Sequence, residues 1–117
     1  LCRVVESRGR TTTFALPVCS PRPAVFDPTA LIRDVREALD ALHAAGFAHL
    51  DVRLDNVLFD HTAGRFVLVD VEFATPLGAA WPTPCPRLRR PEATAEVAVE
   101  DDNYLLGLLA AELGVRL

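Results

Sequence analysis

Hydrophobic and polar residues follow a regular pattern from Pro28 to the residue before Gly46. Within it the apolar side chains recur three or four positions apart, at Leu31, Ile32, Val35, Ala38, Leu39 and Leu42. This spacing places them along one face of an α-helix. Asp27 is a favourable N-cap, Pro28 suits the first helical position, and Gly46 is typical of the residue that ends a helix. The solvent-facing side is expected to carry the charged residues Arg33, Asp34, Arg36, Glu37 and Asp40.

Two pairs of segments have the composition of β-hairpins. Residues 1–7 and 11–16 are rich in apolar and β-branched side chains, and the dipeptide between them, Arg8-Gly9, is a turn signal. Residues 57–59 and 66–69 are also apolar and flank a loop of turn-forming residues. Prolines interrupt residues 17–23 and 73–90, so regular structure is expected to break there.

Side chains that carry oxygen cluster around the second hairpin. Asp51 and Asn56 come just before its first strand, and Asp70 follows its second strand. Taken singly, each is also common turn chemistry, because Asp and Asn favour such positions. As an ordered set they suit Mg²⁺, which prefers oxygen ligands, and phosphoryl transfer depends mainly on positioning and charge neutralisation. The set therefore favours a site for a metal-bound phosphate.

The order His49-x-Asp51-x-x-x-x-Asn56, followed by Asp70 at a strand end, resembles the catalytic core of the protein kinases. The resemblance implies that Asp51 is the catalytic base and that Asn56 and Asp70 bind Mg²⁺ and, with it, ATP. Arg53 stands where the family has a lysine that approaches the γ-phosphate. His49 matches the packing histidine of the motif.

The resemblance extends to other parts of the chain. The helix predicted from Pro28 resembles the long helix that precedes the catalytic loop, and Arg90-Pro91-Glu92 resembles the end of an activation segment. The run from Asp102 to Leu113 aligns with the buried helix of the large lobe, so Asp102 is expected to hydrogen-bond the catalytic-loop backbone. By its order in the chain, a hinge is expected to face adenine with the backbone of Pro17, Val18 and Cys19.

The fold expected from this resemblance is α+β and protein kinase-like. Residues 1–19 would be a remnant of the small lobe and the hinge, and residues 20–117 a portion of the large lobe. The function implied for an intact domain is ATP- and Mg²⁺-dependent phosphotransfer to a Ser or Thr hydroxyl of a protein substrate. The isolated chain is expected to be inactive and to need a missing small lobe or a partner chain.

Several departures from the family pattern leave alternatives open. Val71-Glu72 replaces Phe-Gly, and an acidic pair of this form also occurs in the aminoglycoside and choline kinases, so a small-molecule kinase is one alternative. Glu72 is then either a second carboxylate on the metal side or a surface charge. A glycine-rich loop and a strand lysine are missing, which favours a silent pseudokinase acting as a binding module. Leu50 replaces an arginine that pairs with a phosphorylated activation segment, so that control is not expected.

Composition sets limits on these readings. The 117 residues, of which 50% are hydrophobic, allow one modest core, well short of the roughly 250 residues of a two-lobed kinase. The net charge of −4 provides no basic field for nucleic acid or anionic lipid. Three widely spaced cysteines indicate neither a disulfide framework nor a zinc site, which favours an intracellular, cytoplasmic setting. Charged residues interrupt the apolar runs before they could span a membrane.

Overall fold

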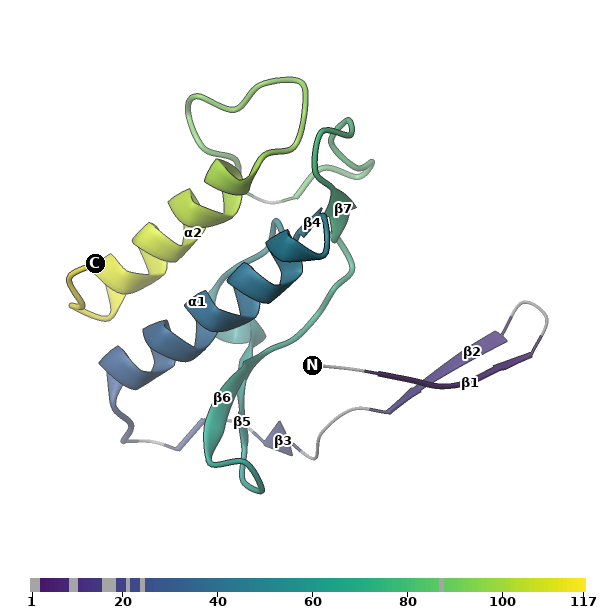
Figure 1. Cartoon of the computed structure of the whole chain (residues 1–117). Helices are drawn as coiled ribbons and strands as arrows, with labels where there is room; N and C mark the ends of the chain where they lie inside the picture. The colour runs from purple at the N-terminus through teal and green to yellow at the C-terminus, as the bar shows by residue number, and fades with distance from the viewer. Residues whose placement is uncertain (1–2, 9–10, 16–18, 21, 24, 87) are drawn as a thin grey trace.

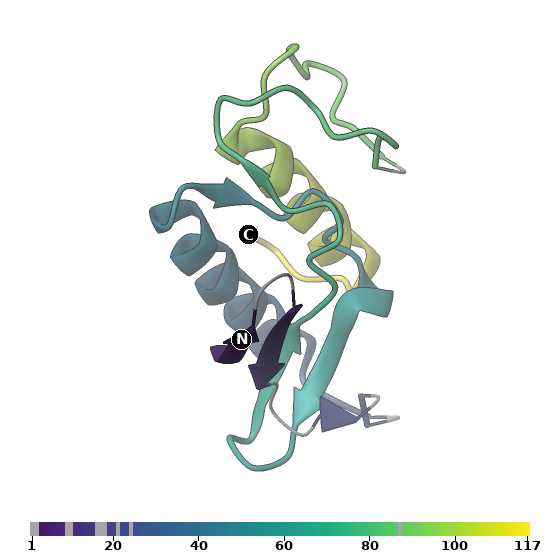
Figure 2. The same ribbon diagram turned by 90° about the vertical axis from the view of Figure 1, so that its right-hand side faces the viewer.

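The computed structural model describes residues 3–8, 11–15, 19, 20, 22, 23, 25–86 and 88–117. Two helices, α1 (Pro28–Ala44) and α2 (Val99–Glu112), lie side by side and antiparallel, and a small sheet packs against α1 (Figure 1). An N-terminal hairpin extends away from both helices. The long segment before α2 forms loops beyond the end of α1 (Figure 2). The architecture is α+β, as the sequence predicts.

The first helix forms as its pattern predicts. The Asp27 carboxylate accepts the N–H of Thr29 at 3.0 Å and so caps the N-terminus, with Pro28 as the first helical residue. Its buried apolar residues are Leu31, Ile32, Val35 and Leu39. Burying each such side chain contributes about 1.5–3 kcal/mol, so this face anchors the core.

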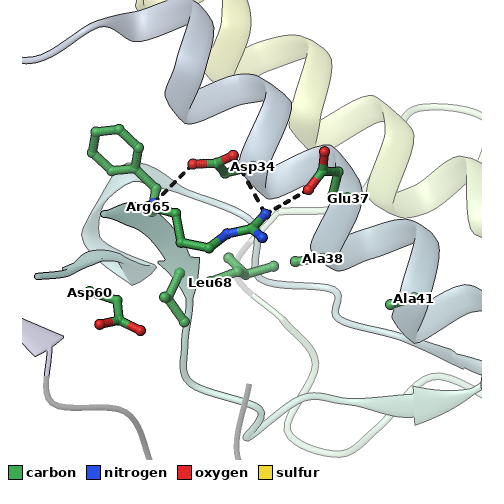
Figure 3. A pocket seen from close by; sticks show the side chains of 9 residues that line it. Asp34, Glu37, Ala38, Ala41, Asp60, Arg65 and Leu68 are labelled. Atoms are coloured by element: carbon green, nitrogen blue, oxygen red, sulfur yellow. Dashed lines mark hydrogen bonds and ion pairs between the residues drawn. The ribbon is translucent and has the colours of Figure 1, made fainter. Parts of the chain in front are cut away.

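Asp34 corrects the prediction of a solvated polar face on α1. Its side chain is only 6% exposed, because its carboxylate accepts the backbone N–H of Phe66 at 3.0 Å. Arg65 lies 3.5 Å from Asp34 and hydrogen-bonds Glu37 at 2.6 Å, at the edge of a pocket of about 290 Å³ between α1 and the sheet (Figure 3). The Glu37 hydrogen bond and the Asp34 charge raise the pKa of Arg65 above its usual value. The helix is thus tied to the sheet by charge as well as by apolar packing.

Both predicted hairpins are present. Strand β1 (Arg3–Arg8) pairs antiparallel with β2 (Thr11–Ala15). Strand β5 (Val57–Asp60) pairs antiparallel with β6 (Arg65–Leu68), with Val57 opposite Leu68. Gly64 takes a φ of +65° in the connecting turn, a conformation that glycine adopts without a steric penalty. The hairpin of β5 and β6 therefore has the two strands that the sequence predicts.

Three two-residue strands lie where the sequence predicted irregular or unassigned structure. β3 (Cys19–Ser20) pairs with β5, and β4 (Phe47–Ala48) pairs with β7 (Thr75–Pro76). The expected break at residues 17–23 and the absence of regular structure at 73–90 are therefore wrong at these points. Such short strands have no pattern of their own, because their partners come from distant parts of the chain.

The second helix completes the core. Asp101 accepts the N–H of Ala98 at 2.8 Å and so satisfies a donor just before the helix. One apolar cluster joins α1, the loop residue Val52, the hairpin and α2, and its buried members are Leu31, Ile32, Val35, Leu39, Val52, Val57, Phe66, Leu68, Leu105, Leu106, Leu109 and Ala110. The core thus places the loop before β5 between the two helices and the sheet. In the described part of the chain, no helix has the length and apolar character needed to cross a membrane.

Candidate functional site

The loop between β4 and β5 is built around a buried histidine. His49 is 1% exposed, and its Nδ1 accepts the backbone N–H of Asp51 at 3.1 Å. Its other ring nitrogen, Nε2, therefore carries the proton and donates to the carbonyl of Val69 at 3.0 Å. His49 thus fixes the backbone of the predicted base and joins it to the strand that leads to Asp70. This matches the packing role expected for His49.

Asp102 anchors the same loop from α2. Its carboxylate is fully buried and accepts the backbone N–H of His49 and that of Leu50, both at 2.8 Å. The predicted contact between Asp102 and the catalytic-loop backbone is therefore confirmed. Leu50 takes a φ of +68°, which bulky residues rarely adopt, and such strain costs about 1–3 kcal/mol. The two charge-assisted hydrogen bonds hold the loop in this strained conformation.

A third hydrogen bond to Asp102 was not predicted. His43, near the end of α1, lies with its Nε2 2.7 Å from Asp102 Oδ2, and its side chain is 10% exposed. In the sequence, His43 stands three positions before Gly46, near the predicted end of the helix. Because the two residues are 59 positions apart, no local pattern could have revealed the contact. Helix α1, helix α2 and the loop are thereby joined at one carboxylate.

The predicted base and metal ligand lie in direct contact. Asn56 is buried at the end of the 3₁₀ turn Leu54–Asn56, and its Nδ2 donates to Asp51 Oδ2 at 2.9 Å and to the Asp51 carbonyl at 2.8 Å. Arg53 Nε lies 3.4 Å from Asp51 Oδ1 and is buried without a hydrogen-bond partner among the described residues. The loop therefore brings Asp51, Arg53 and Asn56 together as a carboxylate, a cation and an amide.

Asp70 stands at the exit of the hairpin. The preceding residue, Val69, donates its N–H to the carbonyl of Asn56 at 2.8 Å and accepts from His49, so the chain reaches Asp70 beside the loop. Asp70 takes a φ of +65°, which Asp tolerates better than most residues. Its side chain is exposed and accepts only the N–H of Glu72, at 3.3 Å, among the described residues. Both of its oxygens are consequently accessible to a ligand.

Asn56 and Asp70 carry oxygen donors of the kind that bind a magnesium ion shared with phosphate. Asn56 uses its nitrogen on Asp51, which leaves its Oδ1 without a hydrogen bond among the described residues. Asp70 offers an exposed carboxylate. No group of three or more His, Cys, Asp or Glu residues in the described part of the chain is arranged to hold a metal alone. Mg²⁺ is usually held by one or two protein oxygens, with water and phosphate supplying the rest, so Asn56 and Asp70 match that requirement.

The surroundings of the loop are mainly apolar. A pocket of about 320 Å³ opens beside the candidate base, and its lining residues are Leu50, Asp51, Val52, Arg53, Leu88 and Leu105. Leu50 also belongs to a small buried apolar cluster with Ala48 and Val97. The partly buried side chains that pack against this cluster are Phe73, Leu77 and Trp81. Position 50 therefore contributes apolar packing to the segment that follows Asp70. It offers no charge to a phosphate there.

The segment before α2 is tied down by an ion pair that was not predicted. Arg90, in the sequence Arg90-Pro91-Glu92, bonds through Nε to Asp101 at 2.6 Å, and both side chains are largely buried. Glu92 is exposed. The resemblance of this tripeptide to the end of an activation segment thus coincides with a fixed connection to α2, made by its arginine.

Of the three residues expected to face adenine, Cys19 is among the described residues. Pro17 and Val18 lie outside the described residues, and Cys19 lies in β3, opposite Asp60 of β5. The chain at Cys19 therefore runs beside the strand that follows Asn56, at its far end. Its expected contact with adenine stays a prediction.

The fold is similar to that of a solved viral kinase. The kinase PK-1 of the Cydia pomonella granulovirus matches with a TM-score of 0.52 and 20% sequence identity, over 73% of this chain. No protein-family model matches the sequence. The match shows a protein kinase-like fold, and this chain spans 34% of the length of the viral kinase. The part of the fold present here contains the loop built around His49 and Asp51.

Proposed function

We propose that this chain carries part of a kinase domain that transfers phosphate from Mg²⁺-ATP to a Ser or Thr hydroxyl of a protein. The observation that carries the proposal is the contact between Asp51 and Asn56, at 2.9 Å, in a loop that Asp102 anchors. A base and a metal ligand placed side by side are what phosphoryl transfer requires, because positioning and charge neutralisation do most of the catalysis.

Each residue of the site has a separate role in this proposal. Asp51 accepts the proton of the acceptor hydroxyl, and its carboxylate is kept oriented by Asn56 Nδ2. Asn56 Oδ1 and the Asp70 carboxylate would hold the metal. Arg53, whose guanidinium lies 3.4 Å from Asp51 and 3.7 Å from Asp55, would supply a positive charge to the transferred phosphate. Bound Mg²⁺-ATP would supply the phosphoryl group and the charge that neutralises it.

The amino-terminal part has a different task in the same proposal. Residues 1–19 would be the small-lobe and hinge portion, with the backbone of Pro17, Val18 and Cys19 toward adenine. The pairing of Cys19 with Asp60 supports this placement, because it ties that segment to the hairpin after Asn56. Residues 20–117 would supply the catalytic loop and its support. The partners are then ATP, a protein substrate and a further small lobe or partner chain.

A small-molecule acceptor is the second candidate. Glu72 is exposed two positions after Asp70, and its N–H bonds the Asp70 carboxylate at 3.3 Å. This turn keeps the backbone of Glu72 beside Asp70, and in this candidate the Glu72 carboxylate would serve as a second carboxylate on the metal side, as the resemblance to the aminoglycoside and choline kinases implies. The Arg90 connection to Asp101 supports the protein acceptor instead, since it fixes the end of an activation-type segment.

The test compares phosphate incorporation by the chain alone, by a chain extended with an upstream small lobe, and by variants of the extended chain. The chain alone should bind Mg²⁺-ATP weakly and transfer nothing, because it lacks a strand lysine and a glycine-rich loop. The extended chain should phosphorylate a generic protein substrate. Asp51→Asn should then lower the rate by about 10²- to 10⁴-fold, the usual effect of losing a general base.

Asp40→Asn is the matched control, because Asp40 is an exposed carboxylate on α1, away from the loop. It should leave the rate unchanged. Equal rates for the extended chain and its Asp51→Asn variant would contradict the catalytic role of Asp51. Phosphate transfer to an aminoglycoside or choline, and not to protein, would favour the second candidate. An extended chain that binds nucleotide without transferring phosphate would instead indicate a pseudokinase.

A further inference from the structure

Arg22 reaches the catalytic loop from the segment that follows β3. Its Nη1 donates to the carbonyl of Leu54 at 2.6 Å and to that of Val57 at 2.8 Å. Those two carbonyls bracket the 3₁₀ turn Leu54–Asn56, at whose end Asn56 is held. One cationic nitrogen therefore ties both ends of the turn that carries the proposed metal ligand.

The recorded pairing of β3 with β5 ends at Ser20, and beyond it a side chain contacts the start of β5. Cys19 pairs with Asp60 and Ser20 with Phe59, so continuing the antiparallel register to residue 22 places it opposite Val57. The residues on either side of Arg22 are Pro21 and Pro23, which have no N–H to donate to a ladder. Among the described residues it is the guanidinium of Arg22 that donates to the carbonyls of Leu54 and Val57.

The same sequence favours the conformation that Arg22 needs. A residue before proline is biased toward extended backbone, so Pro23 limits the states that Arg22 loses when its side chain docks. Hydrogen bonds from a charged donor are also the stronger class. The Val57 N–H bonds the Leu54 carbonyl as well, so Arg22 contacts the same carbonyl that closes the turn.

We propose that Arg22 is a positioning residue for the catalytic loop. Its guanidinium fixes the turn Leu54–Asn56 and thereby the orientation of Asn56 Nδ2 toward the Asp51 carboxylate. The placement of the turn follows from the contacts alone, and its effect on metal binding rests on the proposed function. The contact spans 32 and 35 positions of sequence, so it also couples the segment after β3 to the site.

The experiment uses the whole chain with three substitutions. Arg22→Met keeps the aliphatic stem and removes the donor, while Arg22→Lys keeps an ammonium that can donate to both carbonyls. Arg36→Met, at an exposed arginine of α1, is the matched control. Hydrogen exchange by NMR follows the backbone amides of Asn56 and Val57 and the Asn56 side-chain amide, with the amides of α1 as an internal reference. Broadening of the Asn56 and Asp70 signals by Mn²⁺ added with ATP reports metal binding at the proposed site.

Arg22→Met should lower the protection of the turn amides by about 10-fold or more, while α1 amides and the Arg36→Met control stay unchanged. Arg22→Lys should restore most of the protection. The Mn²⁺ concentration for half-maximal broadening should rise by about 10-fold in Arg22→Met, as it does when a residue that orients a metal ligand is lost.

Unchanged protection of the turn in Arg22→Met would overturn the proposal. So would an equal loss across α1, because that would reflect general destabilisation. If Mn²⁺ with ATP does not broaden the Asn56 and Asp70 signals of the unmodified chain while Arg22→Met still loosens the turn, the metal site of the proposed function is wrong and the positioning role of Arg22 stands.

Discussion

Replacing Asp102 with asparagine changes the charge at the centre of the site while keeping its shape. The carboxylate accepts the N–H of Leu50 on one oxygen and the donors of His49 and His43 on the other. An asparagine offers one acceptor oxygen, and its NH₂ group must then face either the Leu50 N–H or the His49 and His43 donors. At least one buried donor therefore loses its partner and meets another donor.

The magnitude follows from these contacts. Each hydrogen bond to a charged group is worth about 1.5–3 kcal/mol, and a buried donor without a partner costs about 1–3 kcal/mol. Relaxation of the strained φ of Leu50 returns a part of this. We therefore expect Asp102→Asn to lower the free energy of unfolding by about 3–5 kcal/mol, a large share of the roughly 5–15 kcal/mol of a small domain.

Urea denaturation of the chain, followed by the fluorescence of Trp81, measures this loss. Hydrogen exchange of the His49 and Leu50 amides locates it, because these two amides should exchange first. Glu112→Gln is the control, since Glu112 is an exposed carboxylate on the same helix. A change in the free energy of unfolding below about 1 kcal/mol, with the two loop amides still protected, would refute the anchoring of the loop by Asp102.

Two further predictions follow from the fold and the loop. Asp34→Ala should lower the free energy of unfolding by about 1–3 kcal/mol, because the buried Phe66 N–H loses its acceptor. The control Asp40→Ala, on the exposed face of α1, should change the free energy of unfolding little. Equal urea midpoints for the two variants would contradict the reasoning. In an extended, active domain, the double variant Thr75→Ala and Thr83→Ala should leave the rate of phosphate transfer nearly unchanged. The reason is that Leu50 replaces the arginine that would pair with a phosphate on either threonine. A large loss of rate per folded molecule in a phosphate-incorporation assay would count against this prediction.

Local patterns were sufficient for the elements that bury a continuous face. The apolar spacing of α1 and its cap at Asp27 predicted both the helix and its buried side. The turn residues between β5 and β6 predicted that hairpin, and the motif order placed Asp51 and Asn56 just before it. These features depend on residues a few positions apart, so periodicity and turn chemistry carry the information.

The charged residues of α1 show where local patterns end. Asp34 lies on a helix position that reads as solvent-facing, yet the β6 strand covers it and supplies the N–H of Phe66 as its partner. The two-residue strands β3, β4 and β7 are similar, because each exists only through a partner from another part of the chain. In both cases a neighbour brought by the fold outweighed the local preference.

The sequence by itself determined the order of the candidate site, with His49, Asp51, Arg53 and Asn56 on one loop and Asp70 after the hairpin. The resemblance also predicted that Asp102 contacts the loop backbone, and only the tertiary structure showed which distant side chains add to that support. His43 reaches Asp102 across 59 positions, and Arg22 reaches Leu54 across 32. A buried backbone group must find a partner wherever the fold provides one, and that choice depends on packing between distant segments, which no spacing along the chain encodes.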